Sequence, residues 1–280
     1  MEDIAVLTQG TPLPRAEYNH QGKIKIGCKK KRRIIPAFLL GTLLCTVLGF
    51  MSLEVDWIKL LSRVPEIGKI FWKLSHLSFS DTGVVLAAMG ETIAIAVLST
   101  IYSILLGLVF GMFAADNIFR VPFLSAAVKS VFSFLRAVPT PVWVLLMLVC
   151  LGFGPTAGIA GLCVHTTAFF TKSFAQSFED IPSATIEALE VTGANKFQIF
   201  TNAVLPAALS QIIAWTGMRF EINFAECAIL GMVGAGGVGF VISTGIQGYE
   251  YGKAGLAILF VFLFAYGIER LFVQLKKRIK

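Results

Sequence analysis

Charged side chains are scarce in this chain. Asp, Glu, Lys and Arg make up 15% of its 280 residues, whereas hydrophobic residues make up 56% and the mean hydropathy is +0.76. A soluble globular domain carries about a quarter of charged residues, so this composition excludes one. It indicates a polytopic helical membrane protein, and the continuous apolar runs disfavour a barrel of alternating strands.

The motifs of metal, redox and nucleotide chemistry are also missing. The three histidines are scattered and no C-x-x-C pair occurs among the five cysteines. The sequence therefore predicts no metal site and no cofactor, with the cysteines as buried small apolar residues of the spans. No G-x-x-x-x-G-K-[S/T] occurs, which excludes ATP binding through a Walker A loop. No nucleophile–base spacing is visible, so we predict no catalytic residue and no enzymatic role.

Long apolar runs are what the chain has instead. One membrane-spanning helix needs about 20 apolar residues, and the sequence offers about six such runs. We therefore predict an all-α fold with about six transmembrane helices. They cover residues 34–53, 84–115, 122–151, 155–178, 207–231 and 254–275.

Lysine and arginine set the predicted orientation. One basic block, 29–33, precedes the first span and another, 276–280, follows the last. Because basic segments next to spans stay in the cytoplasm, both termini are predicted to be cytoplasmic, which places residues 179–206 on the same side. The two blocks explain most of the net charge of +7. That charge therefore indicates anionic lipid headgroups and not nucleic acid.

Three regions follow along the chain: a basic cytoplasmic tail (1–33), a first span with an external segment (34–83), and the main membrane domain (84–280). The first span is too long for a signal-peptide core and lacks a following Ala-x-Ala site, so we expect it to stay uncleaved. Apolar spacing in 54–82 predicts one or two amphipathic helices, broken near Pro65, at the outer interface. A plain loop is the alternative.

Glycines mark two further features. Gly107 and Gly111 form a Gly-x-x-x-Gly step, which permits close helix packing in lipid. Gly234, Gly236 and Gly239 fit the G-x-G-x-x-G pattern of dinucleotide-binding folds, but they follow a membrane span and lack a strand–turn–helix context. We expect a non-helical gate or re-entrant turn there, near the outer end of the fifth span.

Charged residues within the fifth span are costly in a bilayer and should face protein or water. Arg219, Asn223 and Glu226 share one helical face at i, i+4 and i+7, whereas Glu221 points elsewhere. Pairing between helices or subunits is one interpretation, and the lining of a translocation path is the other.

The third span is interrupted by prolines. Pro139 and Pro141 leave backbone carbonyls without their usual donors, which membrane helices tolerate where neighbours or a cavity supply partners. The segment around Arg136 and Pro139 is therefore a candidate for a kinked, pore-facing element. Anchoring of Arg136 at the cytoplasmic end is the alternative.

A polar stretch between the fourth and fifth spans has the form of a docking element. Residues 184–192 predict a short helix capped by Ser183 or Thr185, and Gly193 permits a turn with positive φ. A second short helix, 195–202, leads to Leu205 and Pro206, which suit the start of the next span. The positions that define the pattern are Glu187, Ala188, Gly193, Leu205 and Pro206.

This spacing resembles the cytoplasmic coupling loop of ABC importer permeases, with Leu189 in place of a usual second Ala and Ala203 in place of a common Ile. Over residues 85–275 the chain is similar to the phosphonate-type branch of these binding-protein-dependent permeases. The resemblance is carried by the blocks Phe134–Trp143, Gly152–Gly158 with His165, and Ala228–Gly239.

The resemblance implies a type I importer permease in a bacterial inner membrane that works by alternating access. Its implied partners are a separate ATP-binding subunit, a periplasmic substrate-binding protein and a second permease copy or paralogue. The implied substrate is a phosphorus-containing anion such as phosphonate, phosphite or hypophosphite. Two alternatives remain: a permease of the same architecture for another solute such as methionine, and a membrane enzyme or structural subunit that needs no ATPase.

Overall fold

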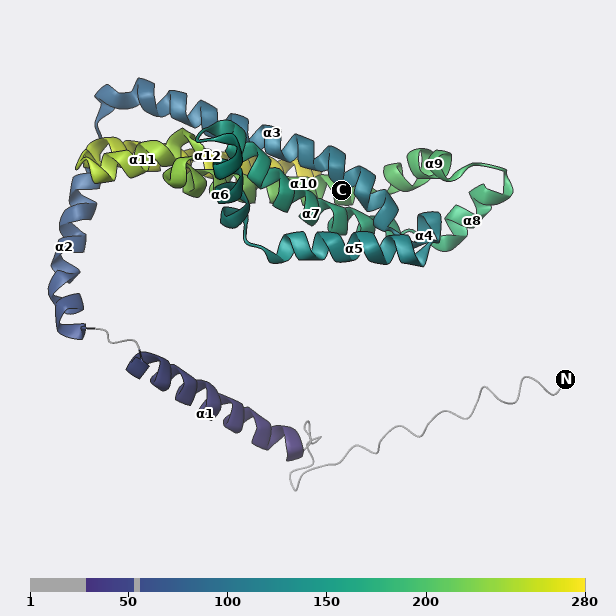
Figure 1. Cartoon of the computed structure of the whole chain (residues 1–280), viewed down its shortest axis with the longest axis horizontal. Coiled ribbons are helices and arrows are strands. Elements are labelled where there is room, and N and C mark those ends of the chain that lie inside the picture. The colour runs from purple at the N-terminus through teal and green to yellow at the C-terminus, as the bar shows by residue number, and fades with distance from the viewer. Residues whose placement is uncertain (1–28, 53–55, 280) are drawn as a thin grey trace. The chain divides into compact units, whose positions relative to one another are not determined.

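The computed structural model describes residues 29–52 and 56–279, and within them every regular element is helical (Figure 1). The all-α prediction is therefore confirmed. The chain divides into two compact units, Met1–Pro65 and Glu66–Lys280. The second unit begins at Glu66, whereas the sequence predicted that the main membrane domain starts at residue 84. Most of the predicted cytoplasmic tail, residues 1–28, lies outside the described residues.

The first unit holds helix α1, Lys29–Ser52. This helix starts at the basic block, whereas the sequence predicted that the span starts at residue 34. Helix α2, Trp57–Ser75, follows and runs on into the second unit. The predicted break near Pro65 is not observed. A proline removes one i→i−4 hydrogen bond, and α2 continues through it as a single amphipathic helix.

The membrane bundle is built around two long helices, α3 (Thr82–Ala114) and α7 (Pro155–Glu179), which pack along each other. The Gly-x-x-x-Gly step lies in their contact. A Cβ added at Gly107 would come within 2.5 Å of the Cβ of Phe170, and one at Gly111 within 3.1 Å of the Cβ of Phe174. The missing side chains thus let the two backbones approach closely, as predicted.

The predicted third span is broken. Helix α5 (Pro122–Ala137) and helix α6 (Thr140–Leu151) are bent by 86° at the intervening residues. The other long elements are α10 (Leu205–Leu230) and α12 (Tyr251–Ile279). Short elements complete the order: the 3₁₀ turn η1 (Phe79–Asp81), α4 (Asp116–Phe119), α8 (Ser183–Val191), α9 (Lys196–Ile199), the π-helical turns η2 (Phe200–Val204) and η3 (Gly231–Ala235), and α11 (Gly237–Gln247).

Four helical stretches of the described chain are long and apolar enough to cross a membrane, or five if the bent pair is one span. The prediction of about six is therefore approximate. The difference lies at α7, which has the length but carries hydroxyl, histidine and lysine side chains. Much of α7 is buried by neighbouring helices, so it meets little lipid and tolerates these polar groups.

Two apolar clusters fill the bundle, one toward α11 and α12 and one toward α8 and α9. Cys227 lies in the first cluster, whereas Cys45 on α1 and Cys150 on α6 are exposed and so depart from the prediction of buried cysteines.

The end of α2 is joined tightly to α12. The Ser78 amide donates to the Gly252 carbonyl at 3.2 Å, and a Cβ on Gly252 would lie 2.6 Å from the His76 carbonyl oxygen. One turn further on, Gly255 lies against the carbonyl of Leu74. Two glycines on one face of α12 thus form a seat for the backbone of α2.

Candidate coupling loop and intramembrane polar cluster

The loop between α7 and α10 is a helix–turn–helix. Helix α8 ends at Val191, Gly193 takes φ +83° in the turn, and α9 begins at Lys196. The predicted cap by Ser183 or Thr185 is wrong, because Pro182 holds the N-cap position of α8 and no side chain caps it.

The cap is on the second helix instead. The Gln198 amide donates to Asn195 Oδ1 at 2.9 Å, and the Asn195 amide donates to Gln198 Oε1 at 3.0 Å. This reciprocal capping box fixes the start of α9 directly after the Gly193 turn. The Asn-x-x-Gln spacing signals it, and the sequence analysis missed it.

Ion pairs tie the loop to α4. Arg120 Nη2 lies 3.4 Å from Glu187 Oε1, and Arg120 Nη1 lies 3.4 Å from Glu190 Oε2. Lys196 also pairs with Glu190 across the turn. The hydrogen bond from Lys196, together with the Arg120 charge, holds the pKa of the Glu190 carboxyl below its ordinary value. Such exposed pairs contribute little each, so they orient the loop more than they stabilise it.

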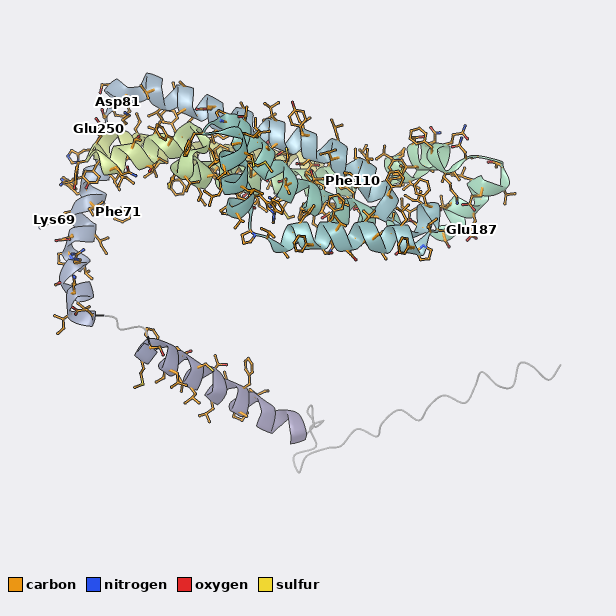
Figure 2. All side chains as sticks on the ribbon, in the orientation of Figure 1. Lys69, Phe71, Asp81, Phe110, Glu187 and Glu250 are labelled. Atoms are coloured by element: carbon orange, nitrogen blue, oxygen red, sulfur yellow. The ribbon has the colours of Figure 1, made fainter. Side chains whose placement is uncertain are left out.

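Buried apolar residues anchor the loop. Ile186 of α8 and Ile199 of α9 are 1% and 2% exposed, and the Phe200 ring meets the Phe178 ring edge-on at 5.1 Å. The outward face keeps Glu187 in solvent, at the end of the bundle far from Asp81 and Glu250 (Figure 2). A rigid element therefore presents one face to solvent while the other is part of the core.

Leu205 and Pro206 lie at the start of α10, as predicted, but no break separates them from the preceding turn. The helical run is continuous from Lys196 through the π turn η2 into α10, and Pro206 is in its second α-helical position after that turn. A π turn shifts the hydrogen-bond register by one residue, which accommodates a residue without an N–H. The loop is thus joined rigidly to α10.

In α10 the three predicted polar residues form one network. Arg219 is 5% exposed, and its Nη2 lies 3.2 Å from Glu226 Oε2 and 3.2 Å from Thr166 Oγ1. Asn223 is fully buried, donates to Thr100 Oγ1 at 2.9 Å and accepts from Thr166 at the same distance. Glu221 is exposed on another face, as its spacing indicates.

Hydroxyls that the sequence analysis did not single out complete this network. Thr166 of α7 bridges Arg219 and Asn223, and Thr140 at the start of α6 donates to Glu226 Oε1 at 3.3 Å. Threonine is too common in spans to be a signal by itself. These contacts join α3, α6, α7 and α10 in a low-dielectric interior, where an unpaired partner would be costly.

Side chains support the break between α5 and α6. Pro139 cannot donate to the Leu135 carbonyl, and the indole Nε1 of Trp143 donates to that oxygen at 3.1 Å. His165 Nδ1 lies 3.3 Å from the Val138 carbonyl oxygen and holds the bend against α7. Arg136 stacks over the Phe169 ring, 5.4 Å from its centroid. The kink predicted at Pro139 is thus present, and the Leu135 carbonyl that the proline frees has a partner.

The predicted glycine turn lies between α10 and α11. Gly234 and Gly236 have φ of +112° and +84°, which only glycine adopts readily, and Gly237, not singled out from sequence, has +72°. Gly239 lies inside α11, packed against the Ala228 carbonyl. From α3, Glu91 Oε2 accepts from the Gly237 amide at 2.9 Å. The hydroxyl of Thr92, next to Glu91, accepts from the Val238 amide.

The sequence pattern of the family described as binding-protein-dependent transport system inner membrane component matches residues 107–280. The chain belongs to this family. The resemblance stated from sequence is therefore confirmed, and so is the prediction of an ABC importer permease subunit without an enzymatic role.

Family members with related sequences carry names from phosphorus transport. The phosphate-import permease protein PhnE of Mycolicibacterium smegmatis is 31% identical over 83% of this chain and 44% of its own length. The phosphite transport system permease protein PtxC of Stutzerimonas stutzeri is 28% identical over 81% of this chain and 82% of its own length. The chain thus spans less than half of the mycobacterial relative.

Solved ABC transporters share the fold. An inward-facing MetNI methionine ABC transporter matches with a TM-score of 0.66 at 22% identity, covering 73% of this chain and all of that one. A bacterial alginate ABC transporter in complex with its pentasaccharide-bound periplasmic protein matches with a TM-score of 0.58 at 17% identity, covering 89% of this chain and 97% of that one. These likenesses support the type I importer architecture.

Proposed function

We propose that this chain is the permease through which an ABC importer moves a phosphorus-containing anion across the bacterial inner membrane, with both termini in the cytoplasm. The observation that carries the substrate class is the set of relatives named for phosphite and phosphate transport. The one from Stutzerimonas stutzeri matches over four fifths of both chains. Phosphonate, phosphite, hypophosphite and phosphate are the candidate substrates.

Three partners belong to the proposal. Since the sequence holds no Walker A loop, a separate ATP-binding subunit supplies the energy. A periplasmic binding protein delivers the anion, and a second permease copy or paralogue completes the path. The related alginate transporter, solved with its periplasmic protein, supports a partner of this kind.

The rigid connection between the loop and α10 supports a coupling role for residues 179–206. The ATPase would push the exposed face around Glu187, and the buried anchors Ile186 and Ile199 would pass that displacement to the bundle. Because the helical run is continuous from Lys196 to α10, the same displacement reaches the Arg219–Glu226 pair and then the turn at Gly234. Rocking of the two permease halves would open the path alternately to each side.

The test is co-purification of the tagged chain with its genomic neighbours, followed by uptake measurements in proteoliposomes. Stoichiometric recovery of a Walker-A ATPase and ATP-driven uptake of one phosphorus anion are expected. Gly193→Asp should leave membrane insertion intact and abolish coupled uptake. Normal uptake by this variant would exclude the coupling role, and uptake of methionine without any phosphorus anion would exclude the substrate class.

A further inference from the structure

Cationic side chains line the contact between α5 and α7, which lie side by side in the bundle (Figure 1). The two helices meet as an antiparallel ladder. From the loop end toward the bend, Lys129 meets Glu179, Ser133 meets Lys172, and Arg136 meets Phe169. The positions on α5 follow i, i+4 and i+7, so they share one face. We call this face, from Lys129 to Arg136 with Lys172 opposite, the cationic seam.

The charges of the seam are balanced at its loop end only. Lys129 Nζ lies 2.7 Å from Asp116 Oδ2 and 2.8 Å from Glu179 Oε1, so two carboxylates surround it. In residues 29–52 and 56–279, no carboxylate lies within 4 Å of the Lys172 ammonium or the Arg136 guanidinium. Lys172 donates to the neutral Ser133 hydroxyl at 3.1 Å, and Arg136 rests on an aromatic ring.

The neighbouring buried cation is already neutralised. Arg219 also stacks on Phe169, with its Cζ 5.6 Å from the ring centroid, but Glu226 compensates its charge. Two positive charges without a carboxylate partner therefore remain on facing helices, between the Pro139 bend and the acidic loop end. Lys172 on α7 is half-buried and Arg136 on α5 is exposed. A cation without a countercharge is costly at membrane depth and is not needed to pack two helices. Both side chains are open enough to meet a negatively charged occupant.

We propose that Arg136 and Lys172 form an anion-binding station in the translocation path, where a tetrahedral oxyanion accepts hydrogen bonds from both cations. This inference rests on the proposed function. The geometry also gives the station a release side. Lys129 is occupied by its own carboxylates, and Asp116 and Glu179 repel an anion that has passed the station toward the cytoplasm.

The test uses the complete importer in proteoliposomes, with phosphite uptake and ATPase activity stimulated by the binding protein as separate readouts. Lys172→Gln keeps a donor for Ser133 but removes the charge, and Arg136→Gln removes the other charge. Each should lower uptake about tenfold or more while stimulated ATPase activity persists. Lys172→Arg should restore most of the uptake.

Ser133→Ala is the matched control, because it deletes the hydrogen bond of Lys172 to Ser133 and leaves the charge of Lys172. Its uptake should stay near that of the unmodified importer. Equal losses in Ser133→Ala and Lys172→Gln would show a packing role and overturn the station. Should Lys172→Gln not reach the membrane, Arg136→Gln against Arg136→Lys gives the same comparison.

The outcomes separate the two proposals. If the unmodified importer moves phosphite and both glutamine variants move it equally well, the station is wrong and the proposed function stands. If the unmodified importer moves none of the phosphorus anions, the proposed function fails and the station falls with it.

Discussion

The indole of Trp143 donates its N–H to the carbonyl of Leu135, the acceptor that Pro139 leaves unpaired. A residue just past a membrane-helix break thus supplies the hydrogen bond that the break removes. A specific side-chain hydrogen bond therefore supports the bend of 86° between α5 and α6.

Trp143→Phe should weaken the bend. The ring stays but the Leu135 carbonyl loses its donor, at a cost of about 1–3 kcal/mol for a half-buried group. We expect a lower midpoint of thermal unfolding in detergent. Trp72→Phe, at an indole 69% exposed on α2, is the control and should leave the midpoint unchanged. Equal midpoints for all three proteins would mean that water or lipid serves the carbonyl instead.

The contact between α3 and α7 predicts opposite effects for two glycines of one helix. Gly107→Ala places a Cβ 2.5 Å from that of Phe170 and must separate the helices, costing about 1–3 kcal/mol. Gly90→Ala meets nothing within 4 Å and should stabilise α3 by about 0.5–1 kcal/mol. Thermal unfolding of both variants checks this, and similar midpoints would contradict the close packing.

The coupling loop should loosen in acid. Lys196 and Arg120 hold the pKa of Glu190 below its ordinary value of 4.5, so the carboxylate supports the loop fully above pH 4.5. As the pH falls through the lowered pKa, Glu190 is protonated and that support is lost. A spin label at Val191, which is 89% exposed, should become more mobile over this range.

Glu190→Gln supplies the comparison for this titration. Its label should already be mobile at neutral pH and should show no acid transition. A transition of the same size in this variant would assign it to another carboxylate.

Helix α11 is predicted to depend on α3 for its first turn. Glu91→Leu removes the carboxylate that accepts from the Gly237 amide, and loss of such a cap costs about 0.5–2 kcal/mol. Hydrogen exchange of a peptide covering 231–247 should accelerate about fivefold. Glu91→Gln retains an acceptor oxygen and should change exchange less. Unchanged protection in Glu91→Leu would show that packing alone holds this turn.

Much of the fold is predictable from this sequence because each helix that crosses a membrane needs a long apolar run, and such runs are visible in the sequence itself. Apolar runs of the right length predict helices, and Gly193 with its flanking residues predicts the helix–turn–helix. The run 155–178 predicted α7, but it does not show that other helices bury the polar residues of α7. The same limit explains Pro65, which interrupts a helix in isolation but not in α2.

The polar cluster was predictable only on one helix. Periodicity placed Arg219, Asn223 and Glu226 on one face, since i, i+4 and i+7 are neighbours in any α-helix. Their partners Thr100 and Thr166 come from helices far away in the sequence. Lys172 was missed for the same reason, because its missing countercharge becomes visible only once α5 lies against α7.

The seat of α2 on α12 also orders events during synthesis. Leu74 and Gly255 are far apart in the sequence, and at about 5–20 residues per second the ribosome needs roughly 10–40 seconds to pass from one to the other. Throughout that interval α2 lacks its contact with Gly252 and Gly255 of α12. Helix α12 therefore completes the contact of α2, and chains that stop before Tyr251 leave the end of α2 open to quality-control proteases.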